Sequence, residues 1–367
     1  MQSLVQLLVT LTGVTLLFAC AQTNGTMERA AKHALRLCRG RAALLPPMFF
    51  LLSALLAMIG PGAILATALM APFAMTTGVR AGVPVFLIAL MVGNGANAGN
   101  LSPFSTVGAI VSSLMTANGL GGHEMRIWFF NGIAHLAVAV CAYFLFGGVR
   151  LSRKATAQAA LTPPKMETRH WITIGVTLSW IAAVIVLRWP LGWPAFGAAA
   201  ILLTLRLASL QESVRKMPWK VILLVTSIST AVGLLDRAGG LVWFQDLLAR
   251  LATPQTVHAV IAGLTGLISA YSSTSGVVLP AFLPMAPGLA ARLPGVDPLS
   301  LSISINIGSA LVDVSPLSTI GALCIAAAPP ESDTRQLFVR LLLWGLSMVL
   351  VGAAICYMGS PFFRAFE

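Results

Sequence analysis

The residues that could bind an ion or an anion lie in a short motif that the sequence contains twice. Residues 102–108 read Ser-Pro-Phe-Ser-Thr-Val-Gly, and residues 315–321 read Ser-Pro-Leu-Ser-Thr-Ile-Gly, 213 positions later. Each copy lies in a strongly apolar segment and follows residues rich in Gly and Asn or Asp. Because Pro removes a backbone donor and Gly loosens a helix, we predict that both copies are helices unwound inside a membrane. Two such breaks at corresponding positions are the best sequence indication of a transporter binding site.

One carboxylate is set apart by its position. Of the eleven Asp and Glu residues, only Asp313 falls at membrane depth, two residues before the second motif copy. An ionisable group is costly there, so we expect Asp313 to bind a coupling cation or a proton. The structural alternative is a cap on the half-helix that starts at Pro316. The residue 213 positions earlier is Asn100, which offers an amide instead of a charge.

The hydroxyl groups of the two motif copies suit an anion. Half-helix N-termini carry partial positive charge and free N–H groups, so they attract anions without any Arg. We predict that the ends of the half-helices hold a small dicarboxylate, and that unwound carbonyls and hydroxyl oxygens beside them hold Na⁺. The alternative is that the Gly, Ser and Thr residues only allow close helix packing. The hydroxyl donors would be Ser102, Ser105, Thr106, Ser315, Ser318 and Thr319.

The composition places these motifs in a membrane. The 367 residues are 57% hydrophobic and only 9% charged, and the mean hydropathy is +0.88, which indicates a polytopic helical membrane protein. The formal charge of +12 comes from Lys and Arg in short loops, so membrane orientation explains it better than nucleic-acid binding. The Cys and His residues have no metal-type spacing, and no Ser-His-acid set or phosphate loop suggests an enzyme. We therefore expect no cofactor other than a coupling ion.

The apolar segments form two halves with the same order of elements: span, interfacial helix, re-entrant hairpin, broken helix and span. The hairpin arms, about 14 residues each, are too short to cross ~30 Å of hydrocarbon. In residues 1–147 we expect these elements at 3–21, 25–42, 45–76, 79–116 and 126–147. In residues 171–367 we expect them at 219–235, 239–252, 256–287, 298–328 and 335–358, after two additional spans at 171–187 and 193–207. The broken helices divide into 79–92 plus 104–116 and 298–312 plus 316–328, and 208–220 is a basic loop.

Charge indicates how the halves are oriented. If the linker 148–170 is cytoplasmic, 17 of the 23 Lys and Arg residues lie inside and six lie outside. The opposite placement reverses that ratio, so a cytoplasmic linker and inverted repeats are favoured. The first hairpin then opens inward and the second outward. The first repeat has no counterpart of the spans at 171–207, which suggests that it is shortened at its N-terminus.

Two long stretches resemble a known family. Residues 93–103, Gly-Asn-Gly-Ala-Asn-Ala-Gly-Asn-Leu-Ser-Pro, together with 269–276 and 312–319, are similar to the MatC-type dicarboxylate (malonate) carriers of the ion transporter superfamily, which includes the divalent-anion/sodium symporters. The resemblance implies a homodimer that moves substrate by an elevator-type mechanism. It also implies that hairpin-tip hydroxyl and amide groups contact the substrate and Na⁺. Ser273, Thr274 and Ser275 match that pattern at the second tip, whereas Gly60-Pro61-Gly62 at the first tip carries neither group.

The motifs and the resemblance together define the expected site. We expect substrate contacts from Asn97, Asn100, Ser102, Ser105, Thr106, Ser273, Thr274, Ser275, Ser315, Ser318 and Thr319. We expect the coupling ion at Asp313, Asn94, Ser272 and Gly308.

The sequence therefore predicts an all-α polytopic membrane protein, an inverted-repeat transporter with two re-entrant hairpins and two broken transmembrane helices. Its predicted function is secondary transport of a small dicarboxylate, coupled to Na⁺ or H⁺, across a bacterial inner membrane. One alternative is a cation/proton antiporter or inorganic-anion exporter. Another is a truncated, inactive remnant.

Overall fold

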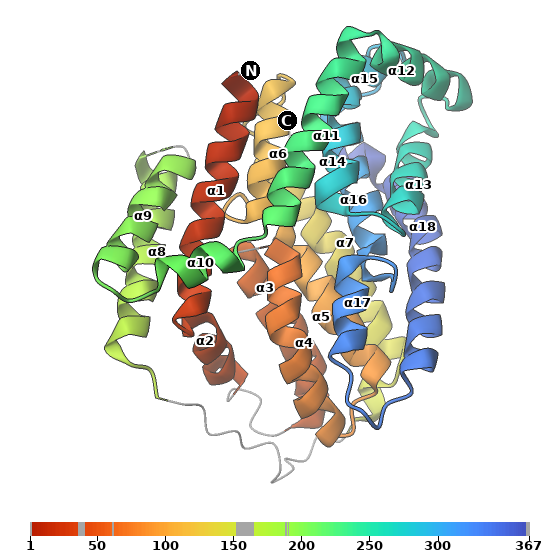
Figure 1. Cartoon of the computed structure of the whole chain (residues 1–367). Helices are drawn as coiled ribbons and strands as arrows, with labels where there is room; N and C mark the ends of the chain where they lie inside the picture. The colour runs from red at the N-terminus through yellow and green to blue at the C-terminus, as the bar shows by residue number, and fades with distance from the viewer. Residues whose placement is uncertain are drawn as a thin grey trace.

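The computed structural model describes residues 2–35, 41–60, 62–151, 165–187, 189 and 191–364. Helices and short turns account for the ordered elements, and no β-strand occurs within these ranges, which confirms the all-α fold. The long helices run roughly along one common direction (Figure 1).

Among its described residues, the first half contains seven α-helices and two short 3₁₀ turns. They are α1 (Gln2–Thr23), α2 (Thr26–Leu35), η2 (Ala42–Leu44), α3 (Leu45–Met58), α4 (Gly62–Arg80), α5 (Val85–Asn100), α6 (Thr106–Ala117), α7 (Glu124–Leu145) and η3 (Gly148–Arg150). The predicted span at 3–21 and the basic helix from 25 are present as α1 and α2. Residues 36–40 of that basic segment, Pro61 and most of the linker, 152–164, lie outside the described residues.

The second half is longer because three additional helices lie at its start among the described residues. It contains α8 (Thr168–Leu187), α9 (Gly192–Thr204), α10 (Leu210–Lys216), α11 (Trp219–Arg237), α12 (Gly240–Leu251), α13 (Val257–Ser269), η5 (Thr274–Val278), α14 (Leu279–Phe282), η6 (Leu283–Met285), α15 (Ala286–Ala290), α16 (Pro298–Leu311), η7 (Val312–Val314), α17 (Thr319–Ala326) and α18 (Thr334–Arg364). The basic loop expected at 208–220 in fact holds α10, whose N-terminus is capped by the Ser209 hydroxyl.

The lengths of the helices fit a protein that crosses a membrane several times. Among the described residues, four helices are long and apolar enough to span a bilayer, or up to six if two bent pairs each count as one span. The four are Gly62–Arg80, Glu124–Leu145, Pro298–Ala326 and Thr334–Phe363. The bend of 84° between α11 and α12 lays α12 across the direction of its neighbours, in agreement with an interfacial helix.

Both predicted hairpins are present, with corrected boundaries. The first consists of α3 and α4, and its second arm has 19 residues instead of about 14, since it continues past position 76 to Arg80. The second hairpin turns by 120° between α13 and the segment Thr274–Ala290. Its second arm ends at Ala290, three residues after the predicted end at position 287. In Figure 1 the α3–α4 pair lies in the lower part of the molecule, and α13 to α15 lie in the upper part.

Both predicted breaks are present, but the first is shorter than expected and the second is longer. The segment 93–100 was predicted to be unwound, yet it is the C-terminal half of α5, and the first half-helix runs from 85 to 100 instead of 79 to 92. The first break therefore covers only 101–105. In the second broken helix, α17 starts at Thr319 instead of Pro316. Glycine and asparagine are tolerated in α5 because the helix is buried on every side, so packing outweighs their low propensity.

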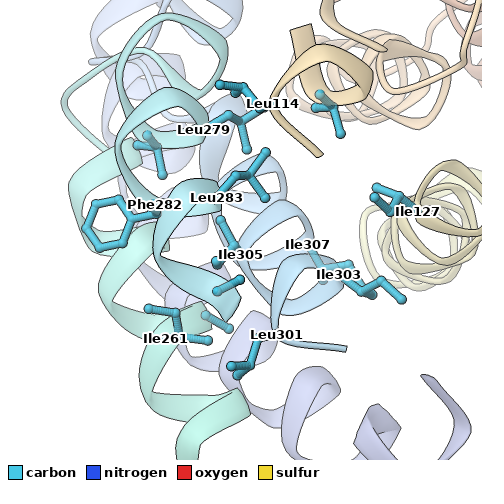
Figure 2. Packing of buried hydrophobic residues seen from close by; sticks show 14 of the residues in the cluster. Leu114, Ile127, Ile261, Leu279, Phe282, Leu283, Leu301, Ile303, Ile305 and Ile307 are labelled. Carbon is cyan, nitrogen blue, oxygen red and sulfur yellow. The ribbon is translucent and has the colours of Figure 1, made fainter. Parts of the chain in front are cut away.

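Two helices form the centre of the molecule. Every residue of α5 from Phe86 onward is buried, and so is every residue of α16 from Leu299 onward. Figure 2 shows Leu279 and Leu283 of the second hairpin packed toward Ile305 of α16, with Leu114 and Ile127 approaching from α6 and α7. The two half-helices that precede the breaks are thus held in place from all directions.

Glycines bring the hairpins close to these central helices. A Cβ added at Gly95 of α5 would lie 2.2 Å from the Phe50 carbonyl oxygen of α3. At the equivalent position in the second half, a Cβ on Gly308 of α16 would lie 2.4 Å from the Ala262 carbonyl oxygen of α13. Both contacts are between backbones, so a neighbouring side chain cannot move aside to relieve them.

Replacing Gly95 by Ala should therefore destabilise the fold, by about 1–3 kcal/mol from overpacking. The measurement is the thermal unfolding midpoint of purified protein in detergent. Gly175→Ala is the matched control, because nothing lies within 4 Å of its added Cβ, and helix propensity predicts a slight gain of up to ~1 kcal/mol. Equal midpoints for the two variants would contradict the close packing of α5 on α3.

Candidate functional site

The two motif copies fold into the same turn. The Ser102 hydroxyl accepts a hydrogen bond from the backbone N–H of Phe104 at 3.3 Å. The Ser315 hydroxyl accepts one from the N–H of Leu317 at 3.4 Å. Each turn closes when the fourth motif residue donates its N–H to the carbonyl of the first, at 2.9 Å and 3.0 Å. The next residue begins a new half-helix, so α6 and α17 start 213 positions apart, at Thr106 and Thr319.

The last motif residue must be small. A Cβ at Gly108 would lie 1.8 Å from the Ser102 carbonyl oxygen, and one at Gly321 would lie 2.2 Å from that of Ser315. Real Cβ atoms do not approach backbone oxygens this closely, so only glycine lets the half-helix fold back on the turn. The shared sequence therefore encodes a compact helix break, and the first Ser of each copy is engaged within it.

The fourth motif residue has different partners in the two halves. In the first half, the Ser105 hydroxyl accepts the N–H of Gly108 at 2.8 Å and caps α6, while lying against the Asn100 carbonyl. In the second half, the Ser318 hydroxyl instead donates to the Asp313 carboxylate, and it makes no cap on α17. The first N–H groups of α17 are thus left without a side-chain cap, and Thr319 beside them is exposed.

The first hairpin tip docks on the first break through backbone groups. The Asn100 side-chain oxygen accepts the N–H of Ala63, at the start of α4, at 2.8 Å. The Gly60 carbonyl accepts the N–H of Thr106 at 3.3 Å. The tip has no hydroxyl or amide side chain. The Asn100 side chain therefore supplies the hydrogen-bond acceptor for the N–H at the start of α4. Thr106 remains buried with no hydrogen-bond partner for its hydroxyl among the described residues.

The second hairpin tip docks on the second break through side chains. The Thr274 hydroxyl lies 2.5 Å from that of Ser269, 3.3 Å from the Ser309 carbonyl, and against the Asp313 carboxylate. Ser273 accepts the N–H of Gly276 at 3.0 Å, so it caps the π-turn η5. Ser275 is buried at this tip, whereas Ser272 bonds the Ile268 carbonyl one turn earlier and points back along its own helix.

The two breaks are joined at the centre. The Asn97 side-chain amide donates to the carbonyl of Ala310 at 3.4 Å, and these residues are 213 positions apart. Equivalent positions of the two repeats thus contact each other. A small apolar cluster of Ala57, Ala63, Ala66, Ala96 and Ile320 packs the first tip against α17. In the same way, α6 packs against η6 of the second hairpin. Each tip therefore lies beside its own break. The first tip also packs against α17, and the second arm of the second hairpin packs against α6.

Asp313 gives this region its charge. Among the described residues it is the one buried Asp, Glu, Lys or Arg, with 7% of its surface exposed. Hydroxyl groups surround its carboxylate, so a small cation or a proton is the partner that would neutralise it. A group of three His, Cys, Asp or Glu residues that could hold a transition metal does not occur in the described ranges.

Two of the expected ion ligands, Gly308 and Asn94, make contacts with neighbouring helices. Gly308 packs α16 on α13, as described above. Asn94 lies away from the break, with its side-chain oxygen 3.0 Å from Nδ1 of His135 on α7. One turn earlier, the Asn131 amide donates to the Asn97 carbonyl at 2.9 Å. These α7 residues are absent from the expected site, although a polar pair four positions apart in an apolar span could have indicated them.

Comparisons with known proteins agree with this arrangement. A family model described as CitMHS, citrate transporter, matches residues 3–306. A comparison with curated protein sequences finds no match. Among solved structures, the Alcanivorax borkumensis YdaH transporter is similar over 98% of this chain and 85% of its own, with a TM-score of 0.61 and 16% identity. At that identity the similarity concerns the fold alone.

Replacing Asn100 by Ala should destabilise the protein, since it leaves the Ala63 N–H buried without an acceptor, at a cost of about 1–3 kcal/mol. Asn100→Asp keeps an oxygen at the same place and should retain more of the stability. Thermal unfolding midpoints of the two variants in detergent test this ranking. A midpoint for Asn100→Ala equal to that of the unmodified protein would show that the first tip is held by other contacts.

Proposed function

This chain belongs to the CitMHS citrate transporter family, and from that membership we propose that it is a secondary transporter for a small anion with two or three carboxyl groups. It is a multi-pass membrane protein with a transporter fold. The observation that carries the proposal is the pairing of Ser318 with Asp313 beside the uncapped start of α17. This pairing puts an anion-attracting group and a cation-attracting group next to each other.

The start of α17 is the proposed substrate contact. Its first N–H groups have no side-chain cap and carry the positive end of the helix dipole, so a carboxylate can accept hydrogen bonds there. Thr319 is exposed at this point and can donate its hydroxyl. The buried Thr106 hydroxyl, which has no hydrogen-bond partner among the described residues, offers a further donor on the side of the first break, whereas the unpartnered Asn97 Oδ1 can only accept a hydrogen bond or coordinate a cation.

The coupling cation follows from electrostatics. An anionic substrate beside an ionised Asp313 would be repelled, because like charges at short range disfavour each other. A Na⁺ ion or a proton on Asp313 removes that repulsion, so substrate binding and cation binding favour each other. We propose that this mutual dependence couples transport to the cation gradient.

The finer features remain part of this proposal. The resemblance to MatC-type carriers supports a dicarboxylate of malonate or C4 size, whereas the name of the family model supports citrate. We further propose inverted repeats, a homodimer, an elevator-type movement and a location in a bacterial inner membrane. The different hydrogen bonding at the two breaks supports a division in which the second break binds the cation and the first mainly holds the structure.

A cation/proton antiporter is the second candidate. It is favoured by the isolation of Asp313, because no Lys or Arg is buried among the described residues to pair with a carboxylate. Such a protein would exchange Na⁺ for H⁺ across vesicle membranes without any organic anion. The proposed symporter would require malonate, succinate or citrate for cation movement.

Asp313→Asn should abolish the dependence of transport on the cation, since the amide cannot be neutralised by Na⁺ or a proton. The experiment measures uptake of labelled malonate, succinate and citrate into proteoliposomes, with a Na⁺ gradient, a pH gradient or neither. The expected result is gradient-driven uptake by the unmodified protein and at least a tenfold loss of that stimulation in the variant.

Asp236→Asn is the matched control, because Asp236 is exposed at the end of α11. It should leave the stimulation unchanged. Gradient-stimulated uptake that persists in folded Asp313→Asn protein would overturn the role of Asp313. Na⁺/H⁺ exchange without any of the three anions would select the antiporter.

A further inference from the structure

An apolar cavity borders the first hairpin tip, where Ile59 lines it. It has a volume of about 340 Å³ and lies between the end of α1, α2, the first hairpin arm α3 and α8. Its wall includes Phe18, Met27, Ala30, Leu52, Leu56 and Ile174. In Figure 1, α2 lies at the lower end of the molecule between α8 and α3, and α2 packs against both helices.

The cavity offers no polar group to a ligand. Three threonines line it, and each hydroxyl donates to a protein acceptor. Thr26 donates to the Asn24 side-chain oxygen at 2.6 Å. Thr173 and Thr177 donate to carbonyls one turn earlier in α8, each at 2.8 Å. A carboxylate or a cation would therefore lose its hydration here without replacement. The apolar wall is therefore suited to binding a hydrocarbon chain.

The cavity reaches the outer surface of the protein. Leu55 of α3 and Leu178 of α8 line it while remaining 39% and 54% exposed. At roughly 30 Å³ per water-sized group, the volume has room for on the order of ten methylene groups. An apolar void of this size does not fill with water, and leaving it empty forfeits dispersion contacts along its whole wall. Acyl chains of the bilayer are the hydrocarbon nearest to such an opening.

A basic cluster lies on the elements that bound the cavity. Arg29, next to the lining residue Ala30 on α2, forms an ion pair with Glu167 at 2.8 Å. Arg169, one turn before Thr173 on α8, pairs with the same carboxylate at 2.9 Å. The hydrogen bond from Arg29 lowers the pKa of the Glu167 carboxyl, so this group is ionised at neutral pH. Counted by themselves, these two guanidinium groups and one carboxylate leave an excess of one positive charge.

We propose that this cavity binds one anionic phospholipid, with an acyl chain along Phe18, Leu52 and Ile174 and the phosphate at Arg29 and Arg169. The volume and apolar lining of the cavity account for the chain, and the excess positive charge accounts for the headgroup. The lipid would join α2 and α8 to the first hairpin arm. This inference does not depend on the transported substrate.

Native mass spectrometry of the full chain tests the proposal. Detergent-solubilised protein is mixed with equal amounts of phosphatidylglycerol and phosphatidylcholine that have the same acyl chains. The unmodified protein should retain one phosphatidylglycerol at least five times more often than phosphatidylcholine. Ile174→Trp fills the cavity and should reduce retention of both lipids at least tenfold. Arg169→Gln should keep retention but bring the ratio of the two lipids close to one.

Two further variants make the result decisive. Ile201→Trp places the same large side chain on a half-exposed position of α9 and should leave lipid retention unchanged. Ala30→Leu narrows the cavity with a smaller change, so it serves if Ile174→Trp does not fold. Retention unaffected by both cavity variants, equal retention of the two lipids by the unmodified protein, or no retained lipid would each overturn the proposal.

Discussion

The structure depends on one constraint: backbone groups freed inside an apolar environment must find partners within the protein. The two breaks meet it with the same seven-residue turn, in which a serine hydroxyl accepts a freed backbone N–H and a glycine leaves room for the next half-helix to fold back on the turn. Each hairpin tip then satisfies groups that the turn leaves open. The central helices α5 and α16 must be buried on all sides because they carry these breaks.

The repeated turn also explains how one motif can have two uses. In the first half, Ser105 caps the following half-helix and Asn100 accepts an N–H of the hairpin tip, so both side chains stabilise the fold through hydrogen bonds within the protein. In the second half, Asp313 replaces the amide and draws Ser318 away from the cap. A single difference between the repeats thereby leaves a helix end available to an anion and a charge available to a cation, which is the chemical basis of the proposed transport.

Packing and polarity separate the interior into distinct environments. Glycines at equivalent positions let each hairpin arm touch its central helix backbone to backbone, so the region of the breaks is dense. By contrast, the space between α2, α3 and α8 is loosely packed and lacks any free polar group. A hydrophilic ligand is suited to the first environment and a hydrocarbon chain to the second. The proposed substrate and lipid sites therefore differ in chemistry.

The sequence by itself determined the helical membrane class, the two breaks and the position of Asp313 inside an apolar segment, because hydropathy and a repeated motif are local signals. It misplaced the first half-helix, since the glycines and asparagines of 93–100 read as unwinding until their burial in α5 is known. It also could not assign Asn94 to His135 or Gly308 to packing. Those roles were decided by the tertiary structure, because they depend on which surface of a fully buried helix each neighbour covers. A sequence pattern does not specify these neighbours.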